Sequence, residues 1–204
     1  MSPTIKVLLA EDQSMVREAL AALLGLEDDI EVVAQVARGD EVLAAAQTHA
    51  VDVALLDIEM PGMTGIQAAA QVHKTLPGVK LVVLTTFGRP GYLRSAMEAG
   101  ADAFLVKDAP AAQLAAAVRK VLAGERVIDP TLAAAALAEG ANPLTDRERE
   151  VLRAAEDGST NAELATKLHL SQGTVRNYLS TAIQKLAVRN RAEAARLARE
   201  KGWL

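Results

Sequence analysis

The stretch VDVALLDIEMPG, residues 51–62, decides the fold, because it joins a short apolar run to a carboxylate and then to a turn. The run at residues 53–56 is apolar at every position, which predicts a strand buried on both faces of a sheet. Pro61 and Gly62 predict a turn soon after this strand ends. A buried strand that ends in Asp57 is therefore the starting point for the rest of the chain.

Similar runs alternate with Ala- and Leu-rich helical stretches through the first part of the chain. This alternation indicates βαβ units and hence a parallel sheet that is covered on both faces. We expect an α/β doubly wound fold with a five-stranded parallel sheet, followed by a small all-α domain. The expected strands are residues 5–10, 31–36, 53–56, 80–84 and 103–106, and the expected helices are residues 14–24, 41–48, 66–75, 91–99 and 111–123.

Reactive side chains stand where four of the expected strands end, and these ends meet at the sheet edge where ligands bind. Carboxylates this close repel one another, and Mg²⁺ relieves the repulsion because it binds carboxylate, water and phosphate oxygens. A lysine suits a phosphoryl group as a point charge, and an aspartate can attack phosphorus as a nucleophile. The strand-end residues are Glu11 and Asp12, then Asp57, then Thr85, then Lys107.

Each of these residues also has an ordinary structural interpretation. Glu11 and Asp12 can cap the helix expected near Ser14. Asp57 can begin the turn before Pro61, and a threonine or lysine at a strand end needs no function. The combination is harder to attribute to chance, since four separate strand ends must place suitable groups on one edge.

The strand-end set, together with residues 60–62 (Met-Pro-Gly) and 104–107 (Phe-Leu-Val-Lys), resembles the receiver domain of bacterial two-component response regulators. The resemblance covers residues 4–124 and implies a flavodoxin-like fold. It also implies that Asp57 is the phosphoacceptor and that Thr85 and Lys107 contact the phosphoryl oxygens.

The same resemblance implies a metal ion and a switch. Asp12, Asp57 and the backbone carbonyl of Glu59 would bind Mg²⁺, with Glu11 close to the metal. Phe104 would be the aromatic residue that turns inward together with Thr85. Core packing is the alternative role for Phe104, and one side chain can serve both.

Composition and charge narrow the class of protein further. The chain has no cysteine, which excludes disulfides, zinc-thiolate sites and thiol catalysis. No apolar run approaches the ~18 residues of a membrane span, and no signal peptide is recognisable, so we expect a cytoplasmic protein without membrane insertion. Residues 1–128 hold 11 basic and 16 acidic side chains, whereas residues 144–204 hold 11 basic and 8 acidic ones. This asymmetry indicates two domains with different partners.

Turn and capping signals divide the second half of the chain. Asp129-Pro130 and residues 140–143 (Gly-Ala-Asn-Pro) mark a linker, so we expect domains at 1–124 and 144–204 with a linker at 125–143. Capping boxes at residues 145–148 and 160–163 open two short helices, and Ser171 opens a third helix to about Leu186. A fourth helix is expected from Asn190 to near Gly202. Two helices joined by a very short turn indicate a helix-turn-helix.

The third of these helices has two distinct faces at 100° per residue. One arc is apolar and predicts the core contact. The neighbouring arc is small and polar and carries Arg176 and Asn177, side-chain types that read guanine and adenine edges. A solvent-exposed face is the alternative, but no Asp or Glu lies between Gly173 and Lys185, as expected of a surface that meets phosphates. The polar arc contains Gly173, Arg176, Asn177, Ser180 and Gln184.

Residues 144–200 resemble the LuxR/NarL-type helix-turn-helix, through residues 144–152, 161–165, 173–177 and 185–191. The resemblance implies that Arg176, Asn177 and Ser180 face the DNA groove. Two departures, Ser180 in place of a basic residue and Tyr178 in place of histidine, leave base preference open. The implied phosphate contacts are Thr174, Lys185 and Arg189. Ala192, Ala195 and Ala198 would allow the last helix to approach a second copy.

Together the two halves resemble a NarL/FixJ-class response regulator. The resemblance implies phosphorylation by a sensor histidine kinase, homodimerisation on phosphorylation and binding to double-stranded promoter DNA. Residues 26–33, 85–92 and 200–203 are similar to the DesR-like branch of this family. This similarity implies a response to a membrane-embedded thermosensor kinase and control of lipid desaturation.

Two other functions compete with this interpretation. A Mg²⁺-dependent hydrolase that passes through an aspartyl phosphate would use Glu59 as its proton donor, but the chain offers no cap domain and no second substrate pocket. A regulator whose receiver is only a scaffold would not need Asp57, Thr85 and Lys107. We therefore expect no enzyme beyond the receiver's own Mg²⁺-dependent phosphotransfer and dephosphorylation.

Overall fold

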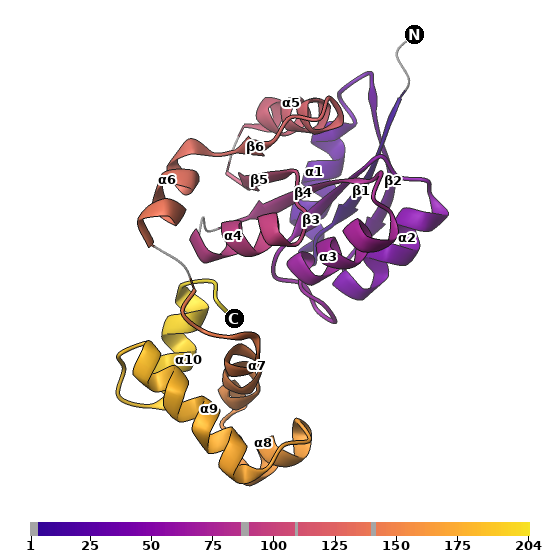
Figure 1. Ribbon diagram of the computed structural model, residues 1–204. Helices are drawn as coiled ribbons and strands as arrows, with labels where there is room; N and C mark the ends of the chain where they lie inside the picture. Colours follow the sequence, from indigo (N-terminus) through magenta and orange to yellow (C-terminus); the bar gives the residue numbers. More distant parts are fainter. Residues whose placement is uncertain (1–3, 87–89, 109, 140–141) are drawn as a thin grey trace. The chain divides into compact units, whose positions relative to one another are not determined.

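The computed structural model describes residues 4–86, 90–108, 110–139 and 142–204, and it contains two compact units (Figure 1). A sheet unit is formed mainly by residues up to Ala134, and a helical unit mainly by residues from Ala135 onward. The predicted linker positions 140–141 and residues 87–89, which belong to the DesR-like segment, lie outside the described residues. The elements of the sheet unit are β1 (Ile5–Ala10), α1 (Ser14–Leu24), β2 (Ile30–Val36), η1 (Gly39–Glu41), α2 (Val42–Thr48), β3 (Val53–Asp57), α3 (Gly65–Thr75), β4 (Lys80–Thr85), α4 (Pro90–Glu98), β5 (Ala103–Val106), α5 (Ala111–Leu122) and β6 (Val127–Ile128).

The sheet is parallel throughout and has the strand order β2-β1-β3-β4-β5-β6. The predicted doubly wound α/β fold is confirmed, and all five expected strands are present. A sixth strand was not predicted. β6 contains only Val127 and Ile128, which pair with Ala103 and Phe104 of β5. Two residues are too few to carry a periodic signal, so this edge strand could not be recognised in the sequence.

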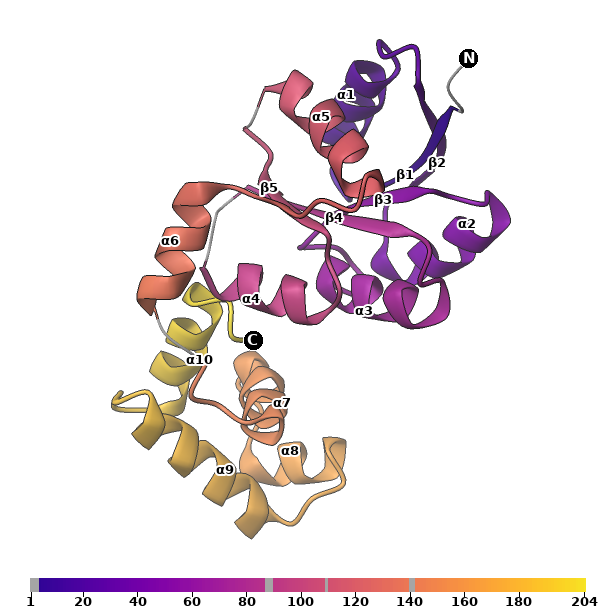
Figure 2. The same cartoon turned by 45° about the horizontal axis from the view of Figure 1, so that its top comes forward.

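Each face of the sheet has its own core, because successive side chains of a strand point to opposite faces. Val7 and Leu9 of β1 pack with the cluster that α1 and α5 cover. Leu8 and Ala10 of the same strand pack with α2 and α3 on the other face. Figure 2 shows these helices on opposite faces of the sheet. Each fully buried leucine contributes about 1.5–3 kcal/mol, so the two cores hold the strand ends firmly in place.

The helical unit is built from short helices with defined starts. Its elements are α7 (Asp146–Ala154), η2 (Ala155–Asp157), α8 (Asn161–Lys167), α9 (Gln172–Lys185) and α10 (Arg191–Glu200), and α6 (Pro130–Glu139) precedes them. Both predicted capping boxes are present, at Thr145 and Thr160, and Ser171 caps α9 as expected. The predicted apolar arc of α9 is confirmed, with Val175, Leu179 and Ala182 buried in one core.

One expectation about α10 is wrong. Ala195 is 7% exposed and Ala198 is fully buried, so both pack in the core of their own unit. Of the three alanines expected to approach a second copy, only Ala192 is exposed. The small side chains therefore serve the close packing of α10 within the unit. Among the described residues, no helix is both long and apolar enough to cross a membrane.

Candidate functional site

The carboxyl edge of the sheet brings the predicted strand-end residues together. β1 leads into Glu11 and Asp12, and β3 and β4 end in Asp57 and Thr85. Lys107 directly follows β5, and its backbone N–H donates to the carbonyl of Thr85 at 2.8 Å. Glu11, Asp57 and Thr85 are at most 5% exposed, so this edge is a buried polar site rather than a solvated rim.

Lys107 is the centre of the charged contacts. Its Nζ lies 2.8 Å from Oδ1 of Asp57 and 2.5 Å from Oε2 of Glu11. The side chains of all three residues are at most 8% exposed. A cation this deeply buried is stable only when carboxylates compensate its charge. The site therefore holds a cation directly beside the Asp57 carboxylate.

Burial and charge oppose one another in setting the pKa of Asp57. Burial raises the pKa of its carboxyl group, and the hydrogen bond and charge of Lys107 only partly offset this effect. Burial alone would lower the pKa of Lys107, but its contacts with Asp57 and Glu11 raise that pKa overall. Lys107 therefore stays charged and keeps its electrostatic hold on both carboxylates.

The carboxylates also fit a divalent cation. Ligand atoms of Glu11, Asp12 and Asp57 lie within 4.8 Å of one another. Asp12 is exposed, which leaves the cluster open on one side. Oε2 of Glu11 is buried and has no hydrogen bond of good geometry, although it contacts Lys107. Carboxylate oxygens are the ligand atoms that Mg²⁺ takes in proteins, so this all-oxygen set fits that ion.

The alternative that the acidic pair caps α1 is not supported. The N-cap position is Gln13, and no side chain caps it. Glu11 instead accepts a hydrogen bond from the Gln13 N–H through Oε1 at 3.2 Å, and its carbonyl accepts one from Arg17 at 2.6 Å. The contact with Arg17 was missed in the sequence, because an arginine one turn into a helix carries no signal of its own.

The loop after Asp57 turns back onto the strand it leaves. Gly62 has φ of +78°, a conformation that side chains with a Cβ rarely adopt. A Cβ on Gly65 would lie 1.8 Å from the carbonyl oxygen of Asp57. Thr64 caps α3 in a capping box with Gln67 and fixes the end of the loop. This loop carries Glu59, whose carbonyl is the remaining predicted metal ligand.

Phe104 is fully buried in β5. By strand alternation it points to the face opposite Ala103 and Leu105, both of which belong to the core under α1 and α5. Its buried position agrees with core packing and equally with the inward orientation expected of a switch residue. Phe104 is paired with Val83 of the neighbouring strand β4, and Thr85 lies two residues further along that strand.

The predicted groove residues lie on one exposed face of α9. Arg176, Asn177 and Ser180 are all exposed. Thr174 is half-buried, and its hydroxyl lies 2.8 Å from Oγ of Ser171, the N-cap. Arg189 follows α9 and its side chain is 89% exposed, with only a loose contact of 3.5 Å to Glu193.

Lys185 has a different environment from the other predicted DNA contacts. Its Nζ lies 2.8 Å from Oε2 of Glu148, a carboxylate that is 5% exposed. Glu148 is also the third residue of α7, and its side chain closes the capping box that Thr145 opens. The capping box could be predicted from the sequence, but the ion pair across 37 positions could not.

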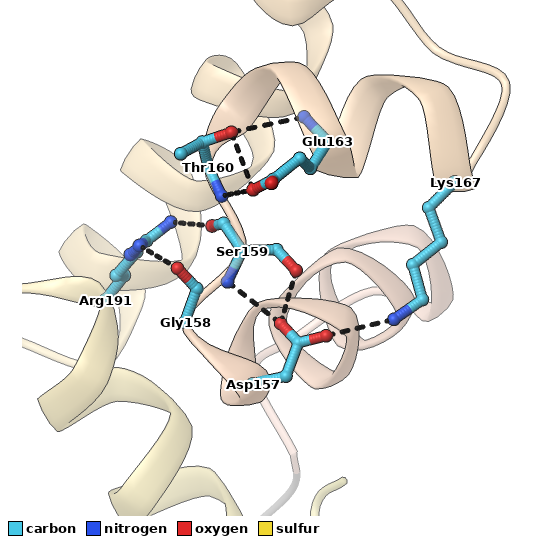
Figure 3. Close-up of polar contacts among 7 residues, drawn as sticks. All are labelled: Asp157, Gly158, Ser159, Thr160, Glu163, Lys167 and Arg191. Carbon is cyan, nitrogen blue, oxygen red and sulfur yellow. Dashed lines mark hydrogen bonds and ion pairs between the residues drawn. The ribbon is translucent and has the colours of Figure 1, made fainter.

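The turn before α8 is fixed by a second set of contacts that the sequence did not reveal (Figure 3). Asp157 accepts hydrogen bonds from the N–H of Ser159 at 2.9 Å and from its hydroxyl at 2.5 Å, and pairs with Lys167 at 3.2 Å. Arg191, the first residue of α10, donates to the carbonyls of Ser159 at 2.6 Å and Gly158 at 3.2 Å. These contacts join α10 to the start of α8.

Two protein-family models match the chain, one in each half. The model of the response regulator receiver domain matches residues 7–119. The model of bacterial regulatory proteins of the luxR family matches residues 142–198. The chain therefore belongs to the response regulators that join a receiver domain to a LuxR-type helix-turn-helix domain. These domains belong to transcription regulators rather than to a family of enzymes.

Particular relatives resemble the chain over nearly its whole length. It is 46% identical to the transcriptional regulatory protein DesR of Bacillus subtilis (strain 168), over 98% of each chain. It is also 46% identical to the uncharacterized transcriptional regulatory protein YvfU of the same organism, over 98% of this chain and 100% of the relative. The crystal structure of the response regulator ChrA from a heme-sensing two-component system superposes with a TM-score of 0.59, at 35% identity, over 98% of this chain and 99% of that one.

Proposed function

We propose that Asp57 accepts a phosphoryl group from a sensor histidine kinase and that this phosphorylation controls binding to promoter DNA. The observation that carries the proposal is the buried Lys107 ammonium, 2.8 Å from Asp57 and 2.5 Å from Glu11. A carboxylate held beside a fixed cation, with a hydroxyl on the next strand, suits the transfer of a phosphoryl group.

The chemical step moves one phosphoryl group. An oxygen of Asp57 attacks phosphorus, an O–P bond forms, and the N–P bond to the kinase histidine breaks, with its electrons returning to the imidazole. Lys107 and the hydroxyl of Thr85 contact the phosphoryl oxygens. Asp12, Asp57 and the carbonyl of Glu59, with Glu11 nearby, would hold Mg²⁺, which would supply positive charge that neutralises those oxygens. The same groups serve hydrolysis of the aspartyl phosphate, and Thr85 and Phe104 are the proposed switch residues.

Phosphorylation can be tested with acetyl phosphate and Mg²⁺ as the phosphoryl donor mixture. The mass of the intact chain should increase by one phosphoryl group. Asp57→Ala should abolish this increase while the fold is retained, because Lys107 keeps its contact with Glu11. Asp108→Ala, at an exposed carboxylate just beyond the site, is the matched control and should be phosphorylated normally. A single phosphoryl group on the Asp57→Ala chain would contradict the assignment, and no group on either chain would favour a receiver that is only a scaffold.

For DNA we propose that α9 enters the major groove with Arg176, Asn177 and Ser180 toward the bases. Their exposure on one face and the absence of acidic residues between Gly173 and Lys185 support this orientation. Thr174 and Arg189 lie at the two ends of the same region and are the proposed phosphate contacts. A regulator that binds chromosomal DNA acts in the cytoplasm, so we propose a cytoplasmic location for this protein. The lipid and temperature response suggested by the DesR-like resemblance stays a prediction.

A homodimer is the proposed active form. One helix-turn-helix buries little DNA surface, so a single copy should bind weakly. Pairing two receivers places the second DNA-binding domain near its half-site at an effective concentration of roughly millimolar, which raises affinity by about 10²–10⁴.

A further inference from the structure

We propose that Lys185 is a positioning residue, which fixes the orientation of α9 on α7 through Glu148, rather than a contact to DNA phosphate. The proposal rests on the proposed DNA binding and changes the role of one residue within it. It assigns base selection partly to an ion pair that does not touch DNA.

The ion pair is more than a surface contact. Nζ of Lys185 lies 2.8 Å from Oε2 of Glu148, and the same oxygen accepts the Thr145 N–H at 2.7 Å. The Glu148 side chain is only 5% exposed, whereas the Lys185 side chain is 33% exposed. Burial would raise the pKa of Glu148, but the bonds from Lys185 and Thr145 lower it overall. Glu148 is therefore a buried, charged carboxylate that depends on Lys185 for compensation.

That dependence opposes a role for Lys185 on DNA. If Lys185 turned toward a phosphate, Glu148 would keep its negative charge in a buried place without a cation. Loss of one partner from a buried pair is strongly unfavourable, because the remaining charge stays desolvated. Arg189 faces no such cost, since its side chain is 89% exposed and its contact with Glu193 is 3.5 Å.

The ion pair between Lys185 and Glu148 joins α9 to α7, so it can orient α9. Glu148 lies in the first turn of α7, and Lys185 is the last residue of α9. The two helices also share an apolar core, in which Leu152 of α7 and Leu179 of α9 are both buried. Apolar contacts are not directional and tolerate small rotations of one helix against another. The ion pair is directional, so it sets the rotation of α9 and thereby the direction of Arg176 and Asn177.

The test compares Lys185→Met, Glu148→Gln and Lys185→Arg in the full chain. Lys185→Met removes the charge but keeps the aliphatic stem. Glu148→Gln removes the opposite charge and keeps the capping box, because a glutamine already closes the equivalent box at Thr64 in this chain. Two probes are needed: a pool of randomised DNA duplexes, from which bound sequences are selected, and one fixed duplex of arbitrary sequence titrated at several salt concentrations.

We expect Lys185→Met and Glu148→Gln to relax base preference in the selected pool to the same extent, and the double variant to match either single one. The slope of log affinity against log salt should stay at the wild-type value for Lys185→Met, whereas Arg189→Ala should lower it by about one unit. Lys185→Arg should restore the base preference. The melting temperature of the helical unit should fall by roughly 5 °C in Glu148→Gln. It should fall further in Lys185→Met, because that variant leaves the buried Glu148 carboxylate without a cation.

A loss of about one unit of salt slope in Lys185→Met, with unchanged base preference, would show a phosphate contact and overturn the proposal. Additive effects of the two substitutions would overturn it as well. A wild-type chain that bound neither probe after treatment with acetyl phosphate and Mg²⁺ would contradict the proposed function itself, which is a separate and recognisable outcome.

Discussion

Asp57 and Lys107 come from strands that are separated by β4, yet their side chains lie 2.8 Å apart. The sequence could predict that these two side chains meet, because the carboxyl ends of parallel strands share one edge. Asp57 is the last residue of β3, and Lys107 directly follows β5. The sequence could not predict the pairing of Lys107 with Glu11 or of Lys185 with Glu148, since both depend on side-chain directions that no local pattern records.

Arg176 gives the first prediction at this scale. Arg176→Ala should weaken binding to a selected duplex by about 1–3 kcal/mol and relax preference at one base position, because an exposed arginine on the proposed groove face can bond two acceptors of guanine. Titration of the selected duplex and of single-base variants measures both effects. Arg196→Ala, which removes an exposed arginine paired with Glu200 on α10, is the control and should leave binding unchanged. Equal losses on every duplex would contradict base reading by Arg176.

Asp157 predicts a dependence of stability on pH. Its hydrogen bonds from Ser159 lower the pKa of its carboxyl group to about 2, below the ordinary value of 3.8. A lowered pKa in the folded state stabilises the fold above the ordinary pKa, and this contribution is lost as the pH falls from about 4 toward 2. Asp157→Asn should therefore show a smaller fall in melting temperature over that range than the wild type. If the melting temperatures of the two chains fell by the same amount over this pH range, the result would contradict this role.

Among the elements, helix starts were predicted most accurately. Thr145, Thr160, Ser171 and Asn190 all cap the helices that they were expected to open, because capping is a local interaction between neighbours in sequence. β6 could not be predicted, because its two residues form a strand only by pairing with β5. The packing of α10 was also mispredicted, since small residues suit a core as well as an interface.

Thr160 allows a test at the level of the element. Thr160→Ala removes the side chain that accepts the Glu163 N–H and bonds its carboxylate, so it should destabilise the helical unit by about 1 kcal/mol. Thr160→Asn should retain most of that stability. Thr166→Ala, in the same helix, removes only an exposed bond to the carbonyl of Ala162 and should have a small effect. Denaturant unfolding compares the three variants, and equal losses for Thr160→Ala and Thr166→Ala would contradict the capping role.

At the scale of the whole molecule, Asp57 and the exposed face of α9 belong to separate compact units. The proposed phosphorylation of Asp57 would therefore act through an equilibrium that the proposed DNA binding also shifts. Dimerisation is the simplest such equilibrium, because it raises DNA affinity without a new contact to DNA. The sequence predicted both units and their order, since each carries its own motif set. It contains no comparable pattern for their coupling.

Sedimentation velocity of a labelled duplex, selected from the randomised pool, tests the central claim most directly. With acetyl phosphate and Mg²⁺, the wild-type chain should sediment with the duplex as two copies per DNA, and Asp57→Ala should stay mostly unbound at the same concentration. The bound duplex should contain two half-sites about one helical turn apart. Tighter binding by one phosphorylated copy per duplex would contradict the account, because phosphorylation would then act by releasing an inhibitory contact rather than by pairing two chains.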